Sequence, residues 1–177
     1  MNSYAYAGIG SRKTPPIFLR QIKLIAWECL NHKYTLRSGG AKGADTAFEE
    51  ETRIAAKIFH ITPHPQIFLP KPELYNIVSW KEAMEIALEF HPAPDVLRSK
   101  QYIMNLMARN SFQVLGADLN TPSDFIVCWT PDGAYNTTSR KTGGTGQAIR
   151  IAIAYNIPVY NIAQPTHLDK LIEERLS

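Results

Sequence analysis

The residue types best suited to chemistry in this sequence are glycines placed directly after apolar runs. Eight of the ten glycines fall in three clusters, which are Gly8 and Gly10, then Gly39, Gly40 and Gly43, and finally Gly143, Gly144 and Gly146. Glycine permits a positive φ angle and lets a ligand approach the backbone closely. Where such a cluster opens a helix, the free N–H groups and the helix dipole favour an anion. One cluster alone is more simply explained by a tight turn, but three of them predict loops that bind phosphate.

Polar side chains accompany all three glycine clusters. The candidate phosphate- or nucleotide-binding residues at these places are Gly10, Ser11, Arg12, Ser38, Gly39, Gly40, Lys42, Gly143, Gly144, Thr145, Gly146 and Gln147. Arg12 has the planar guanidinium that holds a phosphate through two hydrogen bonds, although a solvated loop is an equal alternative for it. The spacing differs from a Walker loop, which ends in Gly-Lys-Ser/Thr. It also differs from a dinucleotide fingerprint, because "GIGSRK" lacks the third glycine.

Two carboxylates follow the second cluster, on the helix that is predicted to begin there. Asp45 lies one residue into this helix, and Glu49 lies one turn further on the same face. Cleavage of an N-glycosidic bond develops positive charge on the sugar, by analogy with glycoside hydrolysis, and requires a carboxylate near that carbon. Asp45 and Glu49 are therefore the candidate catalytic residues. The alternatives are an acid that stabilises the helix dipole for Asp45 and a solvated helix face for Glu49.

The elements that position these residues alternate between strand and helix along the chain. Apolar runs predict strands at 3–9, 33–38, 65–70, 124–129 and 157–162. Helical spacing and capping residues predict helices at 16–31, 44–58, 79–90, 97–117, 144–155 and 166–177, with Ser79 and Thr166 as caps. This order predicts one α/β domain over 1–177, with a Rossmann-like parallel sheet, helices on both faces and an irregular insertion at 70–97. Because ligands bind at the carboxyl ends of such strands, we expect all three glycine clusters at one edge of the sheet.

Composition and charge limit the classes of protein to which this chain can belong. The chain has 177 residues, 45% of them hydrophobic and 20% charged, which is ordinary for a globular domain. The net charge of +3 is too small to predict nucleic-acid binding from the overall field. No apolar run is long enough to span a bilayer, and the first residues lack the order of a signal peptide. We therefore predict a cytoplasmic protein without membrane contact.

The two cysteines predict neither a disulfide nor a metal site. Cys29 and Cys128 lie in apolar patterns, so they are expected to be buried thiols. No cluster of cysteine and histidine has zinc-ligand spacing, so neither a metal nor a cofactor is expected.

Four blocks of the sequence resemble one family of proteins. The blocks are "YAGIGSRKTP", "LRSGGAKGAD", "ARN" and "KTGGTGQAIRIAIAYNIPVYNI", which together span 4–162. They resemble the DNA-processing protein A (Smf) family and its relatives in the SLOG superfamily of Rossmann-like nucleotide-binding proteins. The resemblance implies a Rossmann-like fold with a nucleotide pocket, and members of the family bind single-stranded DNA and recombinase. It also implies a homo-oligomer in which copies pair through helices that flank the sheet.

A more distant resemblance is to the phosphoribohydrolases that activate cytokinins, which are often described as lysine decarboxylase-like. Their signature has an Arg-Lys pair on a helix, then a strand, then "PGGxGTxxE". Arg109 and Asn110 stand at the place of this pair, and Gly143, Gly144 and Gly146 match the glycine frame. The resemblance thus implies phosphate binding, and it adds Arg109 and Asn110 to the candidate binding residues.

Three positions depart from that signature. Thr142 replaces its proline, Gln147 replaces its threonine, and Arg150 stands where the catalytic glutamate is expected. The resemblance therefore implies phosphate binding without an intact hydrolase machinery. An arginine at position 150 would strengthen anion binding, and simple surface exposure on an amphipathic helix is the equal alternative.

A polar loop at 130–142 separates the fourth predicted strand from the last glycine cluster. Loops of this length in compact domains are often functional, so we predict that it covers the pocket like a lid. Trp129 or Tyr135 would then stack on a base. The alternative is a mobile surface loop, with Trp129 in the core.

Three functions are consistent with these features. The first is binding of a nucleotide or a nucleotide-derived small molecule through the glycine-rich loops, without turnover. The second is enzymatic, namely a nucleoside-monophosphate N-glycosidase that releases the base. The third is single-stranded DNA binding, for which Tyr75, Trp80 and Tyr102 are candidate stacking residues, with packing in the core as the alternative for Trp80.

Overall fold

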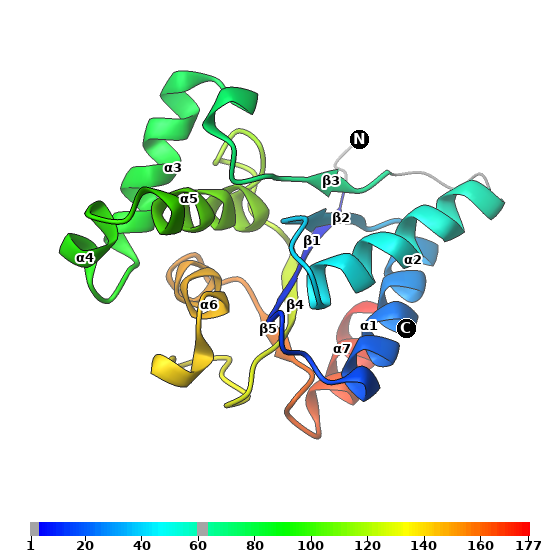
Figure 1. Cartoon of the computed structure of the whole chain (residues 1–177). Coiled ribbons are helices and arrows are strands. Elements are labelled where there is room, and N and C mark those ends of the chain that lie inside the picture. Colours follow the sequence, from blue (N-terminus) through cyan, green and yellow to red (C-terminus); the bar gives the residue numbers. More distant parts are fainter. Residues whose placement is uncertain (1–3, 60–63) are drawn as a thin grey trace.

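A five-stranded parallel sheet forms the centre of the protein (Figure 1). The computed structural model describes residues 4–59 and 64–177. In spatial order the strands are β3 (Gln66–Ile67), β2 (Thr35–Ser38), β1 (Ala5–Gly10), β4 (Phe125–Trp129) and β5 (Val159–Asn161). The prediction of one α/β domain with a Rossmann-like parallel sheet is confirmed, although residue 3 of the first predicted strand lies outside the described residues.

β1 is the central strand, and its register with β4 brings the last residues of the two strands side by side. Gly10 at the end of β1 pairs with Trp129, and Ser38 at the end of β2 pairs with Ile67. The chain leaves β1 toward β2 on one side and later returns to β4 on the other side, so the strand order reverses at β1. In sheets of this type a crevice forms at such a reversal, outside the carboxyl ends of the strands.

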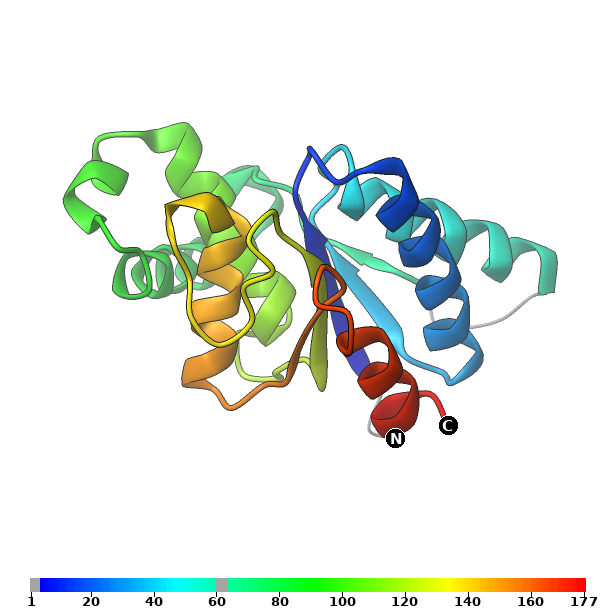
Figure 2. The same cartoon turned by 90° about the horizontal axis from the view of Figure 1, so that it is seen from below.

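Helices cover both faces of the sheet (Figure 2). One face carries α1 (Pro16–Asn31), α2 (Ala44–Phe59) and α7 (His167–Arg175). The other carries α5 (Gln101–Leu115) and α6 (Thr145–Ala154), with α3 (Ile77–Glu89) packed against α5. The remaining helical elements of the described residues are α4 (Pro94–Arg98) and two 3₁₀ turns, η1 (Pro72–Leu74) and η2 (Arg140–Thr142). Within residues 4–59 and 64–177, no helix is both long enough and apolar enough to cross a bilayer.

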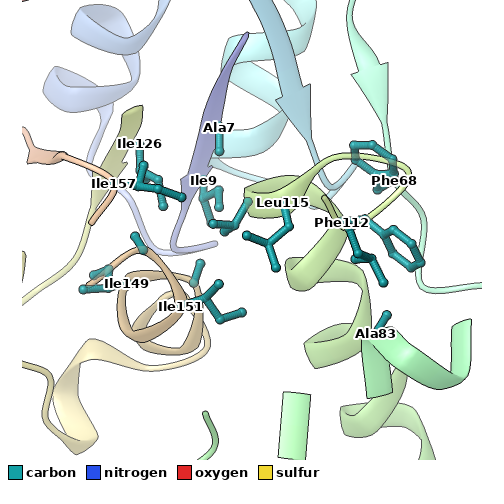
Figure 3. Close-up of a cluster of buried hydrophobic side chains, with 14 of the residues drawn as sticks. Ala7, Ile9, Phe68, Ala83, Phe112, Leu115, Ile126, Ile149, Ile151 and Ile157 are labelled. Atoms are coloured by element: carbon teal, nitrogen blue, oxygen red, sulfur yellow. The ribbon is translucent and has the colours of Figure 1, made fainter. Parts of the chain in front are cut away.

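Figure 3 shows the core between the sheet and the layer of α5 and α6. Ala7 and Ile9 of β1 belong to this core, whereas Tyr6 belongs to the core on the opposite face, because side chains alternate along a strand. Leu115 of α5 and Ile149 of α6 are completely buried here. Burying such a side chain stabilises the fold by about 1.5–3 kcal/mol, so this core fixes α5 and α6 relative to the strand ends.

Two helices differ from the prediction. α3 begins at Ile77 and its cap is Asn76 rather than Ser79, because Asn76 Oδ1 accepts a hydrogen bond from Val78 N (2.8 Å). The single helix predicted at 97–117 is interrupted between α4 and α5, where Lys100 has the non-helical angles φ −127° and ψ 79°. The interruption frees α5 to take its own direction along one side of the sheet.

Cys29 and Cys128 are free and buried, as predicted. Burial in apolar surroundings raises the pKa of both thiols. They therefore contribute to packing, since the thiolate that would act as a nucleophile is disfavoured.

Candidate functional site

A cavity of about 790 Å³ lies at the carboxyl edge of the sheet, lined by Gly10 of the first glycine cluster and by Gly143 and Gly144 of the third. The glycines of the second cluster do not line it, although Ala41 and Asp45 beside them do. The cavity is bounded by the loop after β1, the start of α2, one side of α5, and the segment that leads into α6. The predicted site residues that line it are Gly10, Ser11, Arg12, Asp45, Asn110, Gly143, Gly144, Thr145 and Gln147. Its volume lies in the range of small-molecule sites, and its position is the crevice expected from the strand order.

The other predicted site residues are not on the cavity wall. They are Ser38, Gly39, Gly40, Lys42, Glu49, Arg109, Gly146, Trp129 and Tyr135. Lys42 is exposed. Ser38 and Glu49 are buried, and Ser38 Oγ donates a hydrogen bond to Glu49 Oε1 (2.8 Å). Part of the predicted site therefore lies behind the wall, where it supports the residues that form it.

The segment 143–145, here called the α6 corner, turns the chain into α6 with unpaired backbone N–H groups. Gly143 has φ 68° and ψ −152°, a conformation that is open essentially to glycine alone. No residue in the described part of the chain accepts a hydrogen bond from the N–H groups of Gly143, Gly144 or Thr145. All three residues line the cavity, and the positive end of the α6 dipole adds to the field there.

Two buried amide side chains hold the α6 corner in place. Asn110 Nδ2, on α5, donates hydrogen bonds to Gly144 O (3.2 Å) and Gln147 Oε1 (3.3 Å). Gln147 Nε2 in turn donates to Ala87 O of α3 (3.5 Å). Asn110 and Gln147 therefore position the corner through these hydrogen bonds within the protein.

The loop at 130–142 is tied together by Asp132 and forms one wall of the cavity. Asp132 Oδ2 accepts hydrogen bonds from Thr142 Oγ1 (2.6 Å) and Ser139 Oγ (2.8 Å). Partial burial acts to raise the pKa of Asp132, but these hydrogen bonds outweigh it and lower that pKa. Pro131 and the η2 turn at the two ends of the loop line the cavity.

The segment 39–41, here called the α2 corner, contains the first two glycines of the second cluster and differs from the α6 corner. Glu49 Oε1 accepts a hydrogen bond from Gly40 N (2.9 Å), and Asp45 Oδ2 accepts one from Ala41 N (3.3 Å). Both carboxylates belong to α2, the helix that this corner opens. Glu49 therefore occupies the N–H group of Gly40, which was expected to hold a phosphate.

Asp45 and Arg109 form a buried ion pair beside the α2 corner. Arg109 Nη1 donates to Gly39 O (2.5 Å) and to Asp45 Oδ2 (3.4 Å), and the Arg109 and Asp45 side chains are only 8% and 2% exposed. Asp45 Oδ1 also accepts a hydrogen bond from Gly10 N (3.3 Å), at the end of β1. Burial raises the pKa of Asp45 to about 6, against the opposing effect of Arg109. Burial likewise lowers the pKa of Arg109, against the opposing effect of Asp45.

Basic side chains surround the cavity and come from three elements. They are Arg12 and Lys13 after β1, Arg140 and Lys141 on η2, and Arg150 on α6. Among the described residues that line the cavity, Asp45 is the only carboxylate. This excess of positive charge favours an anion in the cavity.

Arg150 is half-buried, and two of its guanidinium nitrogens donate hydrogen bonds to other residues of the protein. Its Nε donates to Phe90 O (2.5 Å) and its Nη1 donates to Thr138 Oγ1 (2.8 Å). Burial lowers the pKa of Arg150. Arg150 thus ties α6 to the end of α3 and to the loop at 130–142, while it also lines the cavity.

The two residues predicted to stack on a base, Trp129 and Tyr135, have other neighbours. Trp129 is 8% exposed and packs against Phe18 of α1, with 5.8 Å between the ring centroids. Tyr135 packs edge-on against His167, with 4.6 Å between the ring centroids. Neither residue lines the cavity.

The three aromatic residues considered for DNA also differ from one another. Tyr75 and Trp80 stack on Phe112, with centroid distances of 4.6 Å and 6.0 Å, and belong to the core. Tyr102 lines the cavity and is 62% exposed. Of these three, Tyr102 alone is placed to meet a ligand in the cavity.

Part of the cavity wall was not anticipated from the sequence. These residues are His91, Pro92, Ala93, Ile103, Leu106 and Met107. The apolar members on α5 recur at spacings of three and four, which identifies one helix face. That pattern does not distinguish a helix face that lines a cavity from one that packs in the core. The sequence alone therefore could not predict that these residues line the cavity.

Comparison with known proteins shows that this chain is similar in fold to a solved structure. No family model matches the sequence, and no curated protein matches it. Among solved structures, DNA processing protein A from Helicobacter pylori is similar, with a TM-score of 0.51 over 99% of this chain and 74% of that chain, at 15% identity. That protein binds single-stranded DNA. At this identity the similarity shows the fold alone.

Proposed function

We propose that the cavity binds a nucleotide and that the α6 corner holds its phosphate. The observation that carries this proposal is the set of unpaired N–H groups at Gly143, Gly144 and Thr145, which line a cavity of small-molecule size. Several backbone N–H groups at the start of a helix, together with the positive end of its dipole, form an anion site.

The charges around the cavity support the same assignment. Arg12 and Lys13 come from the loop after β1, and Arg140 and Lys141 come from η2, so positive charge reaches the cavity from two separate segments. At the α2 corner, by contrast, an added phosphate would compete with two carboxylates that already accept the available hydrogen bonds. The α6 corner is therefore the better phosphate site.

Hydrolysis of an N-glycosidic bond is an alternative, and Asp45 supports it. Asp45 lines the cavity, and a pKa of about 6 lets a carboxyl group exchange a proton near neutral pH. Glu49 is less suited to this role, since it lies off the wall and accepts hydrogen bonds from Ser38 and Gly40.

Single-stranded DNA is a further alternative ligand. The exposed basic side chains support it, and so does the fold similarity to a protein that binds single-stranded DNA. In that case one phosphate of the chain would occupy the α6 corner and its neighbours would meet the basic side chains. Such binding weakens steeply as salt is added, because counterions are released.

The substitution Gly144→Val tests the phosphate site. Gly144 has φ −63° and ψ −27°, which valine adopts without strain, and an added Cβ would lie 3.5 Å from Met107 Cε, an ordinary contact. The valine methyl groups would then stand in front of the corner. We expect the affinity for AMP, measured by calorimetry, to fall about 10- to 100-fold, as expected for lost hydrogen bonds to a charged group.

A matched control and two further measurements separate the three functions. Ala154→Val, at the exposed end of the same helix, should bind AMP as the wild type does. Equal AMP affinity in Gly144→Val and wild type would contradict the phosphate site. Release of free adenine that disappears in Asp45→Asn would identify a hydrolase. Oligonucleotide binding that does not respond to salt would exclude the DNA alternative.

A further inference from the structure

One wall of the cavity is apolar and begins beside the α6 corner. Ile103, Leu106 and Met107 line the cavity from one face of α5. The same face ends at Asn110, whose Nδ2 donates to Gly144 O (3.2 Å). A Cβ added to Gly144 would lie 3.5 Å from Met107 Cε, so the apolar surface is adjacent to the phosphate site. Pro92 and Ala93, after α3, also line the cavity and extend the apolar surface.

Tyr102 stands at the outer end of this wall with an exposed ring. It lines the cavity and is 62% exposed, whereas Trp80 is 5% exposed within an aromatic stack. Within the described ranges, no other aromatic ring packs against Tyr102. An aromatic ring with an apolar face and a polar hydroxyl suits a site that is partly open to water.

The length of the wall fits a ligand with two unlike ends. An α-helix rises about 1.5 Å per residue, so Tyr102 lies about 7.5 Å along α5 from Met107 and about 12 Å from Asn110. Inorganic phosphate or a sugar phosphate would use the α6 corner and leave the apolar wall in contact with water. A ligand that has an anionic group at one end and a planar aromatic group with an apolar face at the other would use both surfaces.

We infer that Tyr102, Leu106 and Met107 form a subsite for the base of the bound nucleotide. This inference rests on the proposed function above, because the base is directed to the wall by the phosphate in the α6 corner. Stacking on an aromatic ring accepts any base, since every base has a π-face. The subsite therefore supplies affinity for a base without selecting strongly among bases.

The test compares AMP with ribose 5-phosphate, which has the same phosphate and sugar but no base. Calorimetry is performed on the wild type and on the variants Tyr102→Ala, Tyr102→Phe and Tyr155→Ala. Tyr155 is a matched control, because it is 44% exposed at the other end of α6 and does not line the cavity. In Tyr102→Ala we expect AMP affinity to fall about 5- to 100-fold, with ribose 5-phosphate affinity unchanged. Tyr155→Ala should bind both ligands as the wild type does, whereas Tyr102→Phe, which keeps the ring, should lose much less AMP affinity than Tyr102→Ala.

Each other outcome overturns the inference in a recognisable way. Equal wild-type affinities for AMP and ribose 5-phosphate would leave the phosphate site standing and remove the base subsite. An equal loss for both ligands in Tyr102→Ala would make Tyr102 part of the general architecture of the cavity. Unchanged AMP affinity in Tyr102→Ala, together with a smaller assembly in sedimentation, would assign the ring to contact between copies. Failure of the wild type to bind either ligand would remove the proposed function and the inference together.

Discussion

The α2 corner and the α6 corner both place glycines between the end of a strand and the start of a helix, yet their N–H groups have different partners. At the α2 corner, Gly40 N and Ala41 N donate to carboxylates of α2. The first turn of α6 contains no acidic residue, and within the described chain the N–H groups of the α6 corner have no acceptor. The presence or absence of acidic residues on the following helix therefore determines whether the N–H groups of a glycine corner bond to the protein or stay available to a ligand.

This difference gives the two corners different tasks. At the α2 corner the internal carboxylates bring in Arg109, which donates to Gly39 O and Asp45 and so joins α5 to the start of α2. Such a network orders the frame of the cavity, although burying its charges has a cost in desolvation. The α6 corner is held from behind by Asn110 and Gln147, which leaves its N–H groups toward the cavity free.

Breaking the α2 corner should have the largest effect on stability. In Gly39→Ala the new Cβ would lie 1.4 Å from Arg109 Nη1 and 2.8 Å from Gln113 Oε1, so the buried guanidinium must leave its site. We expect the free energy of unfolding to fall by about 3–5 kcal/mol, as when a buried ion pair is broken. Urea denaturation measures this loss.

The matched variant at the α6 corner is Gly144→Ala. It should change the free energy of unfolding by less than about 1 kcal/mol, because the backbone at Gly144 is already helical and the new Cβ meets only Met107 at an ordinary distance. Equal losses in Gly39→Ala and Gly144→Ala would contradict the difference between the two corners.

The next largest effect should appear in the pH dependence of stability. The pKa of Asp45 is about 6 in the folded protein, against an ordinary value of 3.8, so the folded state binds more protons than the unfolded state between these two values. Asp45 therefore destabilises the fold progressively as pH rises from about 4 to 6, by up to about 3 kcal/mol, and its effect is constant above that range. Urea denaturation across this range should show the decline in the wild type relative to Asp45→Asn. Parallel profiles for the two proteins would assign the titration to another group.

A smaller loss is expected when Glu49 is removed from the α2 corner. Glu49→Ala leaves Gly40 N and Ser38 Oγ without their acceptor, which should lower the free energy of unfolding by about 2 kcal/mol. Glu50→Ala is the control on the adjacent residue, because Glu50 is exposed and pairs with exposed Lys23 at 3.4 Å. Its loss should be below about 1 kcal/mol in urea denaturation. A loss in Glu50→Ala as large as that in Glu49→Ala would show that the buried acceptor has no special role.

The order of strands and helices was predictable because apolar runs and helical spacing reflect burial directly. β4, for example, is completely apolar at its first four positions and lies buried between two helical layers. The shared edge of the glycine clusters followed from this order alone. Two departures have local causes: Asn76 competes successfully with Ser79 as a cap, and Lys100 leaves the helical region and interrupts a helical pattern.

Whether the N–H groups of a glycine corner bond to the protein or stay unpaired could not be predicted from the residues of that corner. Glu49 accepts a hydrogen bond from Gly40 N, nine residues earlier in the chain. Nothing in the sequence around a glutamate on an amphipathic helix predicts that it will make such a contact. Likewise, the face of α5 that carries Tyr102 and Leu106 has the same spacing whether it meets a core or a cavity. Such contacts depend on how whole elements pack, and the local pattern does not record that packing.

The most direct test of the difference between the two corners is a titration of isotope-labelled protein with AMP, followed through the amide resonances in NMR spectra. The largest shifts should occur at Gly143, Gly144 and Thr145, where the N–H groups gain phosphate as an acceptor, while Gly40 and Ala41 keep their carboxylate partners and shift little. Large shifts at Gly40 and Ala41, with the α6 corner unaffected, would contradict the account.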